Sequence, residues 1–187
     1  MAKARGLIVS CDLNYRKNLW TTEQAKATME ELLQYVDVLI ANEEDAEKVL
    51  GISAPDTDVT AGKLNKEGYI SVARQINEKY GVSTVAITLR QSISASDNNW
   101  SGMLYTAGKA YFSKEYAVHL VDRVGGGDSF GAGLIYALGH DFEPQKIIEY
   151  AVAASCLKQT MELDVNLATE KEIMALVNGD ASGRVQR

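Results

Sequence analysis

The sequence predicts an α/β fold with a parallel-dominated sheet, and two patterns along the chain support that prediction. Up to residue 89, apolar runs typical of buried strands alternate with amphipathic helical segments. This alternation favours parallel strands joined by right-handed crossovers. Residues 93–112 hold short strand-like runs separated by turn residues, which indicates a meander. Three helical segments complete the chain, and we expect residues 1–187 to form one domain.

The first half of the chain contains the predicted parallel strands, at residues 7–11, 38–41 and 85–89. Thr21 and Gln24 form a capping box at the start of a helix whose apolar positions share one face. Asn42 begins a shorter helix, and residues 66–80 form the next one. Residues 52–65 are rich in turn-forming and polar residues, so we expect a surface loop there.

The second half is predicted to contain short strands and then helices. The strand-like runs lie at residues 93–96, 103–106 and 110–112. The first helix runs from about Ser129 to Leu138, and the second has Pro144 in its first turn. Thr169 and Glu172 form a capping box for the third helix.

Composition and charge restrict the class of protein. With 46% hydrophobic and 24% charged residues, the chain resembles an ordinary globular domain. Its net charge of −6 argues against nucleic acid or an anionic membrane as a partner. Cys11 and Cys156 are far apart in sequence and indicate neither a disulfide framework nor a zinc site. No apolar run has the length of a signal peptide or a transmembrane helix, so we expect a cytoplasmic protein.

The motif D-R-V-G-G-G-D-S-F-G-A-G, which begins at Asp122, is the clearest candidate for a functional site. Gly125, Gly126 and Gly127 are predicted to precede a helix whose first turn contains Asp128. Glycines let successive amide N–H groups converge on one point, and a helix N-terminus favours an anion. A carboxylate beside such a phosphate site could accept the proton of a hydroxyl in phosphoryl transfer.

The same motif has a purely structural interpretation, in which a glycine-rich turn is followed by Asp128 as an ordinary helix cap. Short glycine motifs match many unrelated proteins. A dinucleotide site is disfavoured because the glycines do not follow the first strand and their spacing is not G-x-G-x-x-G.

The motif resembles the C-terminal signature of the ribokinase-like carbohydrate kinases, usually D-T-x-G-A-G-D. Arg123 and Gly126 replace the usual Thr and Ala, while the glycine frame and Asp128 are kept. The resemblance implies a ribokinase-like three-layer sandwich, with the glycines as the anion hole for the ATP phosphates. It also implies that Asp128 contacts the substrate and is the catalytic base, with ATP and Mg²⁺ as cofactors.

A second run, D-x-N-x-R-x-x-L-W from Asp12, resembles sugar kinases of the 2-keto-3-deoxygluconate kinase type. It implies that Asn14 lies near ATP and that Arg16 binds the substrate. This substrate is a sugar acid, and the planar, permanently charged guanidinium group suits a carboxylate or a phosphate. The alternative for Arg16 is an exposed loop side chain without a ligand.

The resemblance implies roles for further residues. Asn42 and Asp45 occupy the family's N-x-x-E positions, so Asn42 would bind ATP and Asp45 would contact Mg²⁺ through water. The alternative for this pair is an ordinary helix cap. The other implied residues are Thr88, Arg90 and Ala154 for ATP and Asp164 for the substrate. Core packing explains the alanine equally well, and Asp164 has the alternative of a solvated loop.

Kinases of this family have a further N-terminal region that supplies sheet strands and a β lid. The resemblance implies that this chain corresponds to their C-terminal part and lacks those elements. We expect ATP-dependent phosphorylation of a sugar acid, with weak nucleotide binding and little turnover by this chain alone. We also expect homo-oligomers formed through exposed strand edges. Two alternatives remain: a kinase of the same fold for another sugar such as fructose, and a non-catalytic nucleotide-binding module.

Overall fold

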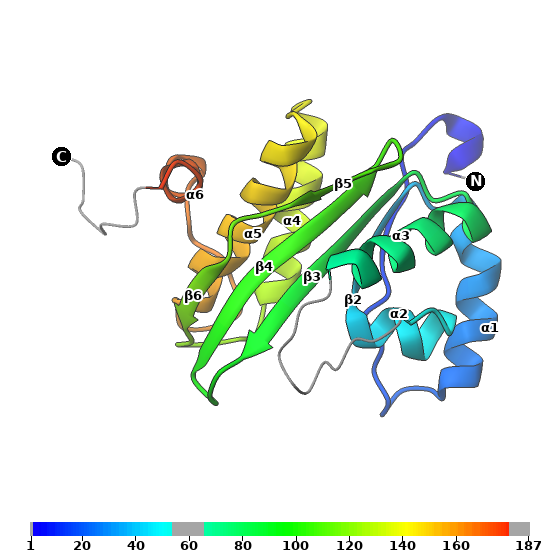
Figure 1. Ribbon diagram of the computed structural model, residues 1–187, viewed down its shortest axis with the longest axis horizontal. Coiled ribbons are helices and arrows are strands. Elements are labelled where there is room, and N and C mark those ends of the chain that lie inside the picture. Colours follow the sequence, from blue (N-terminus) through cyan, green and yellow to red (C-terminus); the bar gives the residue numbers. More distant parts are fainter. Residues whose placement is uncertain (1, 54–65, 180–187) are drawn as a thin grey trace. The chain divides into compact units, whose positions relative to one another are not determined.

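The computed structural model describes residues 2–53 and 66–179, and they form strands and helices in the order drawn in Figure 1. The chain divides into two compact units. Unit 1 contains Met1–Gln91 and Gly102–Tyr111, and unit 2 contains Ser92–Ser101 and Phe112–Arg187. The predicted α/β fold class is confirmed, with a mixed sheet of parallel and antiparallel strands.

Unit 1 contains the parallel strands. They are β1 (Ser10–Asp12), β2 (Val38–Asn42) and β3 (Thr84–Ser92), and both β1–β2 and β2–β3 pair in parallel. The strand order continues through β4 (Asp97–Thr106) to β5 (Lys109–Phe112). The register places Asp12 beside Ile40 and Asn42 beside Thr88. Polar residues therefore lie at the carboxyl ends of neighbouring strands, where α/β proteins bind ligands.

The helices of unit 1 are α1 (Thr22–Leu32), α2 (Glu43–Leu50) and α3 (Lys66–Tyr80). Short 3₁₀ turns lie at Lys3–Arg5 and Leu33–Tyr35. The predicted capping box of Thr21 and Gln24 is confirmed at the start of α1. Buried aliphatic residues of these strands and helices form the core; among them are Leu39 of β2, Val85 and Ile87 of β3, Val49 of α2 and Ile76 of α3.

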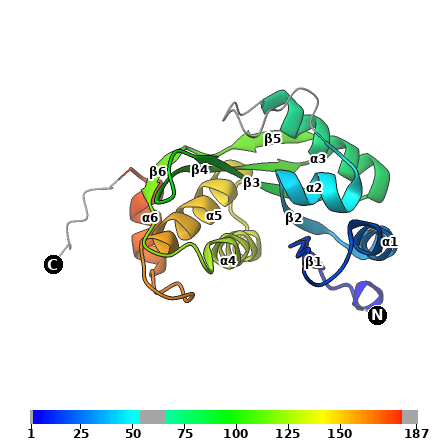
Figure 2. The same ribbon diagram turned by 90° about the horizontal axis from the view of Figure 1, so that it is seen from below.

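Unit 2 contains β6 (Tyr116–His119), which pairs antiparallel with the first half of β4. Its helices are α4 (Gly126–Gly139), α5 (Pro144–Gln159) and α6 (Glu170–Val177), and Figure 2 shows α4 and α5 side by side. The two helices approach closely at Gly133, where a Cβ would lie 3.1 Å from the Cα of Ala151. The predicted capping box of Thr169 and Glu172 is confirmed at α6.

The structure corrects two predicted strands. The strand predicted at 7–11 begins only at Ser10, because its partner strand begins opposite at Val38. Leu7 and Ile8 are consequently 57% and 80% exposed. The strand predicted at 93–96 is instead the turn between β3 and β4, where two amide N–H groups donate to the Asp97 carbonyl.

The structure also contains β6, which was not predicted. Its four residues give too short a pattern to identify without the neighbouring strand. The surface loop predicted at 52–65 lies outside the described residues from residue 54 onward. Within the described ranges, no helix has both the length and the apolar character needed to cross a bilayer. Association through strand edges stays a prediction.

Candidate active site

The glycine motif of unit 2 forms the N-terminus of α4. Gly125 is the N-cap and adopts a left-handed conformation, with φ of 77°. The expectation that three glycines precede the helix is wrong, because Gly126 and Gly127 form its first turn together with Asp128. Among the residues that the structure describes, the backbone N–H groups of Gly127 and Asp128 have no acceptor. They are therefore available to an anion, as expected at a helix N-terminus.

Gly125 and Asp164 are in direct backbone contact. A Cβ on Gly125 would lie 2.1 Å from the Asp164 carbonyl oxygen, so no other residue fits there without a shift of the backbone. This contact places Asp164 beside the glycine motif, and its contact with a substrate stays a prediction. The side chains of both Asp128 and Asp164 are exposed. By contrast, no heavy atom lies within 4 Å of the position of a Cβ on Gly127, so the loop is open on that side.

Helix α5 forms hydrogen bonds with the buried side of this loop. The buried hydroxyl of Ser155 donates to the carbonyl of Gly126 at 2.8 Å. The carbonyl of Gln159 accepts from the N–H groups of Val121 and Asp122, at 2.9 and 3.3 Å. The segment before α4 and the first residue of α4 are thus both hydrogen-bonded to α5.

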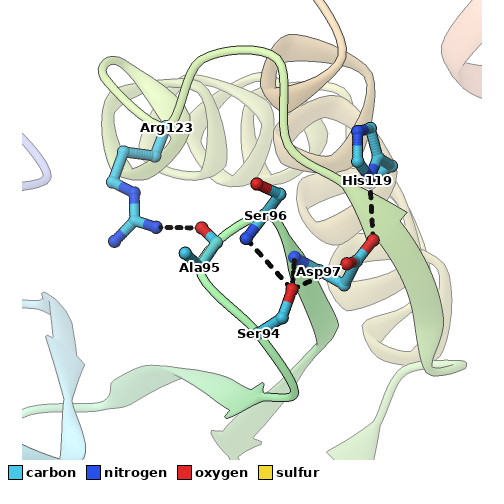
Figure 3. Close-up of polar contacts among 6 residues, drawn as sticks. All are labelled: Ser94, Ala95, Ser96, Asp97, His119 and Arg123. Atoms are coloured by element: carbon cyan, nitrogen blue, oxygen red, sulfur yellow. Dashed lines mark hydrogen bonds and ion pairs between the residues drawn. The ribbon is translucent and has the colours of Figure 1, made fainter.

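The turn between β3 and β4 also contacts the glycine motif (Figure 3). Arg123 donates from Nη2 to the carbonyl of Ala95 at 2.9 Å. The Ser94 hydroxyl donates to Oδ2 of Asp97 at 2.7 Å, and His119 Nδ1 lies 2.7 Å from the other carboxylate oxygen. Hydrogen bonds from His119 and then Ser94 hold the pKa of Asp97 below its usual value.

The second candidate cluster lies in unit 1, where Asn42 caps α2. Its side-chain oxygen accepts from the Asp45 N–H at 2.8 Å, and its Nδ2 donates to Asp45 Oδ2 at 2.9 Å. Asp45 is only 6% exposed. Burial, followed by the negative charge of Asp12, raises the pKa of Asp45 to about 6. The Tyr15 N–H and the Arg16 charge partly oppose that rise.

The loop after β1 brings its polar residues to the same place. Asn14 has a left-handed φ of 39°, and its N–H donates to Oδ1 of Asp12 at 3.2 Å. The interactions of Asp45 with Asp12 and Arg16 show that this loop lies beside the start of α2. Thr88 is next to Asn42 in the β2–β3 register. The structure therefore brings together Asn14, Arg16, Asn42, Asp45 and Thr88.

The oxygen donors of this cluster fit Mg²⁺. Mg²⁺ prefers oxygen ligands and usually keeps several waters, with one or two protein carboxylates and substrate phosphates. Asp45 and Asp12 supply two carboxylates, one of them buried. In the described part of the chain, no group of three or more His, Cys, Asp or Glu residues could hold a metal ion. Water and phosphate oxygens would have to complete the coordination of an ion at these two carboxylates.

Comparison with known proteins decides the family. The pfkB family carbohydrate kinase model matches residues 1–169. The chain belongs to the pfkB family of carbohydrate kinases. It is 50% identical to a solved 2-dehydro-3-deoxygluconokinase from Thermotoga maritima, with a TM-score of 0.89, covering 95% of this chain and 52% of that one.

Two further proteins show how far the likeness extends. A 2-dehydro-3-deoxygalactonokinase from Haloferax volcanii is 25% identical over 182 residues, 97% of this chain and 51% of the relative. An Escherichia coli structure described as a ribokinase II in complex with ATP and Mg²⁺ is 20% identical, with a TM-score of 0.70, over 94% of this chain and 50% of that one. That last likeness shows the fold alone. The chain spans about half the length of these relatives.

The positions of Arg90 and Ala154, which were predicted to bind ATP, do not by themselves indicate a ligand site in this pfkB-family chain. Arg90 is exposed on β3, two residues beyond Thr88. Ala154 is 3% exposed and faces α4, since a Cβ added to Gly133 would lie 3.1 Å from the Cβ of Ala154. The structure uses Ala154 for helix packing, and its contact with ATP stays a prediction.

Sequence reasoning missed the support that α5 gives to the glycine motif. The residues concerned are Ser155, Lys158 and Gln159, all buried. A signal was present, because Lys158 lies four residues after Ala154 and three after Ser155, on a face that is otherwise apolar or small. A charged residue on the buried face of a helix indicates a specific partner.

Proposed function

We propose that this pfkB-family chain carries the ATP-phosphate site and the catalytic base of a kinase that phosphorylates a sugar-acid hydroxyl. The observation that carries the proposal is the position of Asp128. Its exposed carboxylate lies in the first turn of α4, beside N–H groups of the same turn that have no acceptor among the described residues. One short segment thus offers a proton acceptor and an anion site together.

In the proposed reaction, Asp128 orients the substrate hydroxyl and accepts its proton. The hydroxyl oxygen forms a bond to the γ-phosphorus of ATP, and the bond between that phosphorus and the bridging oxygen of ADP breaks. The N–H groups of Gly127 and Asp128 stabilise the negative charge on the transferred group. Gly125 and Gly126 shape the loop that presents them, through the Asp164 and Ser155 contacts.

The proposed roles of the unit 1 residues are binding of the metal and of the nucleotide. Asp45, with Asp12, would hold Mg²⁺ through water, and bound Mg²⁺ would neutralise charge on the phosphates. We assign Asn14, Asn42, Thr88 and Arg90 to ATP, together with Ala154 of unit 2.

For the substrate, Arg16 is the proposed partner of the carboxylate, because its fork of N–H donors matches that group. Asp164 is the proposed partner of substrate hydroxyls. The 50% identity with a 2-dehydro-3-deoxygluconokinase supports a sugar acid over a neutral sugar such as fructose.

The test replaces the matching segment of the T. maritima kinase with this chain and measures ADP release. With ATP and Mg²⁺, we expect turnover with 2-keto-3-deoxygluconate and much less with fructose. Asp128→Asn should lower kcat by roughly 10²–10⁴-fold, the usual contribution of a general base. Asp141→Asn, an exposed aspartate beyond the end of α4, is the matched control and should leave kcat unchanged.

Preference for fructose would reject the sugar-acid substrate. ATP binding that is retained, with no turnover on any sugar, would favour a non-catalytic nucleotide-binding module. Equal kcat for the wild type and Asp128→Asn would remove Asp128 from the role of base.

A further inference from the structure

Lys158 is an unusual buried charge in the last turn of α5. None of its surface is exposed, although lysine is almost never fully buried without a paired group. Within residues 2–53 and 66–179, no carboxylate forms an ion pair with it. Its Nζ instead donates to two backbone carbonyl oxygens, those of Asp122 at 3.3 Å and Met161 at 3.4 Å.

These two carbonyls belong to the segments that meet at Gly125. Asp122 begins the glycine motif, and Met161 lies three residues before Asp164, whose carbonyl contacts Gly125. The side chain of Lys158 therefore lies between the chain entering the anion site and the loop that packs against it. Any change in the distance between those segments would move Gly125 and the helix turn that follows it.

We propose that Lys158 is a positioning residue, whose ammonium group holds the Asp122 and Met161 segments together and so keeps the amides of Gly127 and Asp128 directed outward. An ammonium group suits this role for two reasons. It offers three N–H donors, and hydrogen bonds from a charged donor are stronger than neutral ones. The C-terminal end of a helix also favours a positive charge. An apolar side chain would leave both carbonyls without this donor.

The first experiment measures the loop without any ligand, by amide hydrogen exchange. Lys158→Met keeps an unbranched side chain of similar size and removes the charge. We expect exchange in residues 122–128 and 161–164 to become roughly tenfold faster or more, while the rest of α4 and α5 changes little. Ile148→Ala, a fully buried apolar residue of the same helix, is the control for packing loss and should not single out these two segments. Unchanged exchange in both segments of Lys158→Met would overturn the inference.

The second experiment separates the charge from the filled volume. Lys158→Ala removes the side chain beyond Cβ, and n-propylammonium has the size and charge of the missing part. We expect ATP affinity to fall roughly tenfold or more in Lys158→Ala and to recover with n-propylammonium. The uncharged n-propanol should not restore it, and neither additive should help Ile148→Ala. Equal recovery with n-propanol would show that only volume matters and would reject the role of the ammonium group.

The affinity measurement rests on the proposed function, whereas the exchange measurement does not. If the wild-type chain bound no ATP, the proposed function would fail while the exchange rates would still decide the role of Lys158. Should Lys158→Met fail to fold, thermal unfolding of Lys158→Ala takes over the test. Stabilisation by n-propylammonium but not by n-propanol would support the inference, and no difference between them would overturn it.

Discussion

The carbonyl oxygen of Asp164 lies 2.1 Å from the position that a Cβ on Gly125 would occupy. The two residues are far apart in the sequence, yet their backbones touch. Gly125 therefore meets two requirements at once, a left-handed φ of 77° and the absence of a side chain. Through this contact, the loop after α5 fixes where α4 begins, and with it the position of Asp128.

Gly125→Ala should destabilise the protein by about 2 kcal/mol or more, because the new methyl group forces both the backbone angle and the Asp164 segment to change. Urea unfolding measures the loss. Gly139→Ala, at the other end of α4, is the control, since no heavy atom lies within 4 Å of its added Cβ. That variant should be neutral or stabilising by up to about 1 kcal/mol. If both variants lost a similar free energy of unfolding, the Gly125–Asp164 contact would not be the cause of the loss in Gly125→Ala.

Asp45 should make the protein less stable as pH rises from about 4 to 6. Its pKa is about 6 in the folded state against an ordinary value of 3.8, so the folded state holds more protons in this window. The free energy of unfolding then falls with rising pH, by at most about 3 kcal/mol. Urea unfolding between pH 4 and 7 measures this slope. Asp45→Asn should flatten it, whereas the exposed control Asp141→Asn should retain it. An identical slope in wild type and Asp45→Asn would assign the effect to other groups.

Gly133→Leu should disrupt the packing of α4 on α5. A Cβ at this position would already lie 3.1 Å from both the Ala151 Cα and the Ala154 Cβ, and the remaining leucine atoms have no space. We expect a loss of about 3 kcal/mol or more in thermal or urea unfolding. Ala132→Leu introduces the same side chain at the preceding, exposed position and should change stability by less than about 0.5 kcal/mol. A well-folded Gly133→Leu variant would show that the helices can separate at little cost.

His119→Ala should raise the pKa of Asp97 towards its ordinary value. The His119 hydrogen bond is the largest cause of the lowered pKa, and that from Ser94 is the next. A folded-state pKa that is lowered stabilises the fold above the ordinary value, and this contribution disappears as pH falls. An NMR titration of the Asp97 carboxyl carbon measures the change. Ser94→Ala should raise the pKa less, and a larger rise in that variant would reverse the order of the two contacts.

Local patterns predicted the elements whose signals lie within a few consecutive residues. The capping boxes at Thr21 and Thr169 needed only a side-chain pair three residues apart, and both formed as predicted. The motif from Asp122 likewise predicted the helix and the place of Asp128 in its first turn. Strand limits were less predictable, because a strand extends only as far as its neighbour pairs with it. Ile8 is apolar but lies before the first paired residue, and so it remains exposed.

By itself, the sequence determined two helix caps and the helix turn that holds Asp128, since glycine placement, helix caps and hydrophobic spacing act over short distances. Tertiary structure alone decided what those residues touch. The carbonyl of Asp164 at Gly125, the hydroxyl of Ser155 on Gly126 and the buried ammonium group of Lys158 join segments that are distant in sequence. No local pattern encodes such contacts, because each depends on how a packed helix brings two loops within hydrogen-bonding distance.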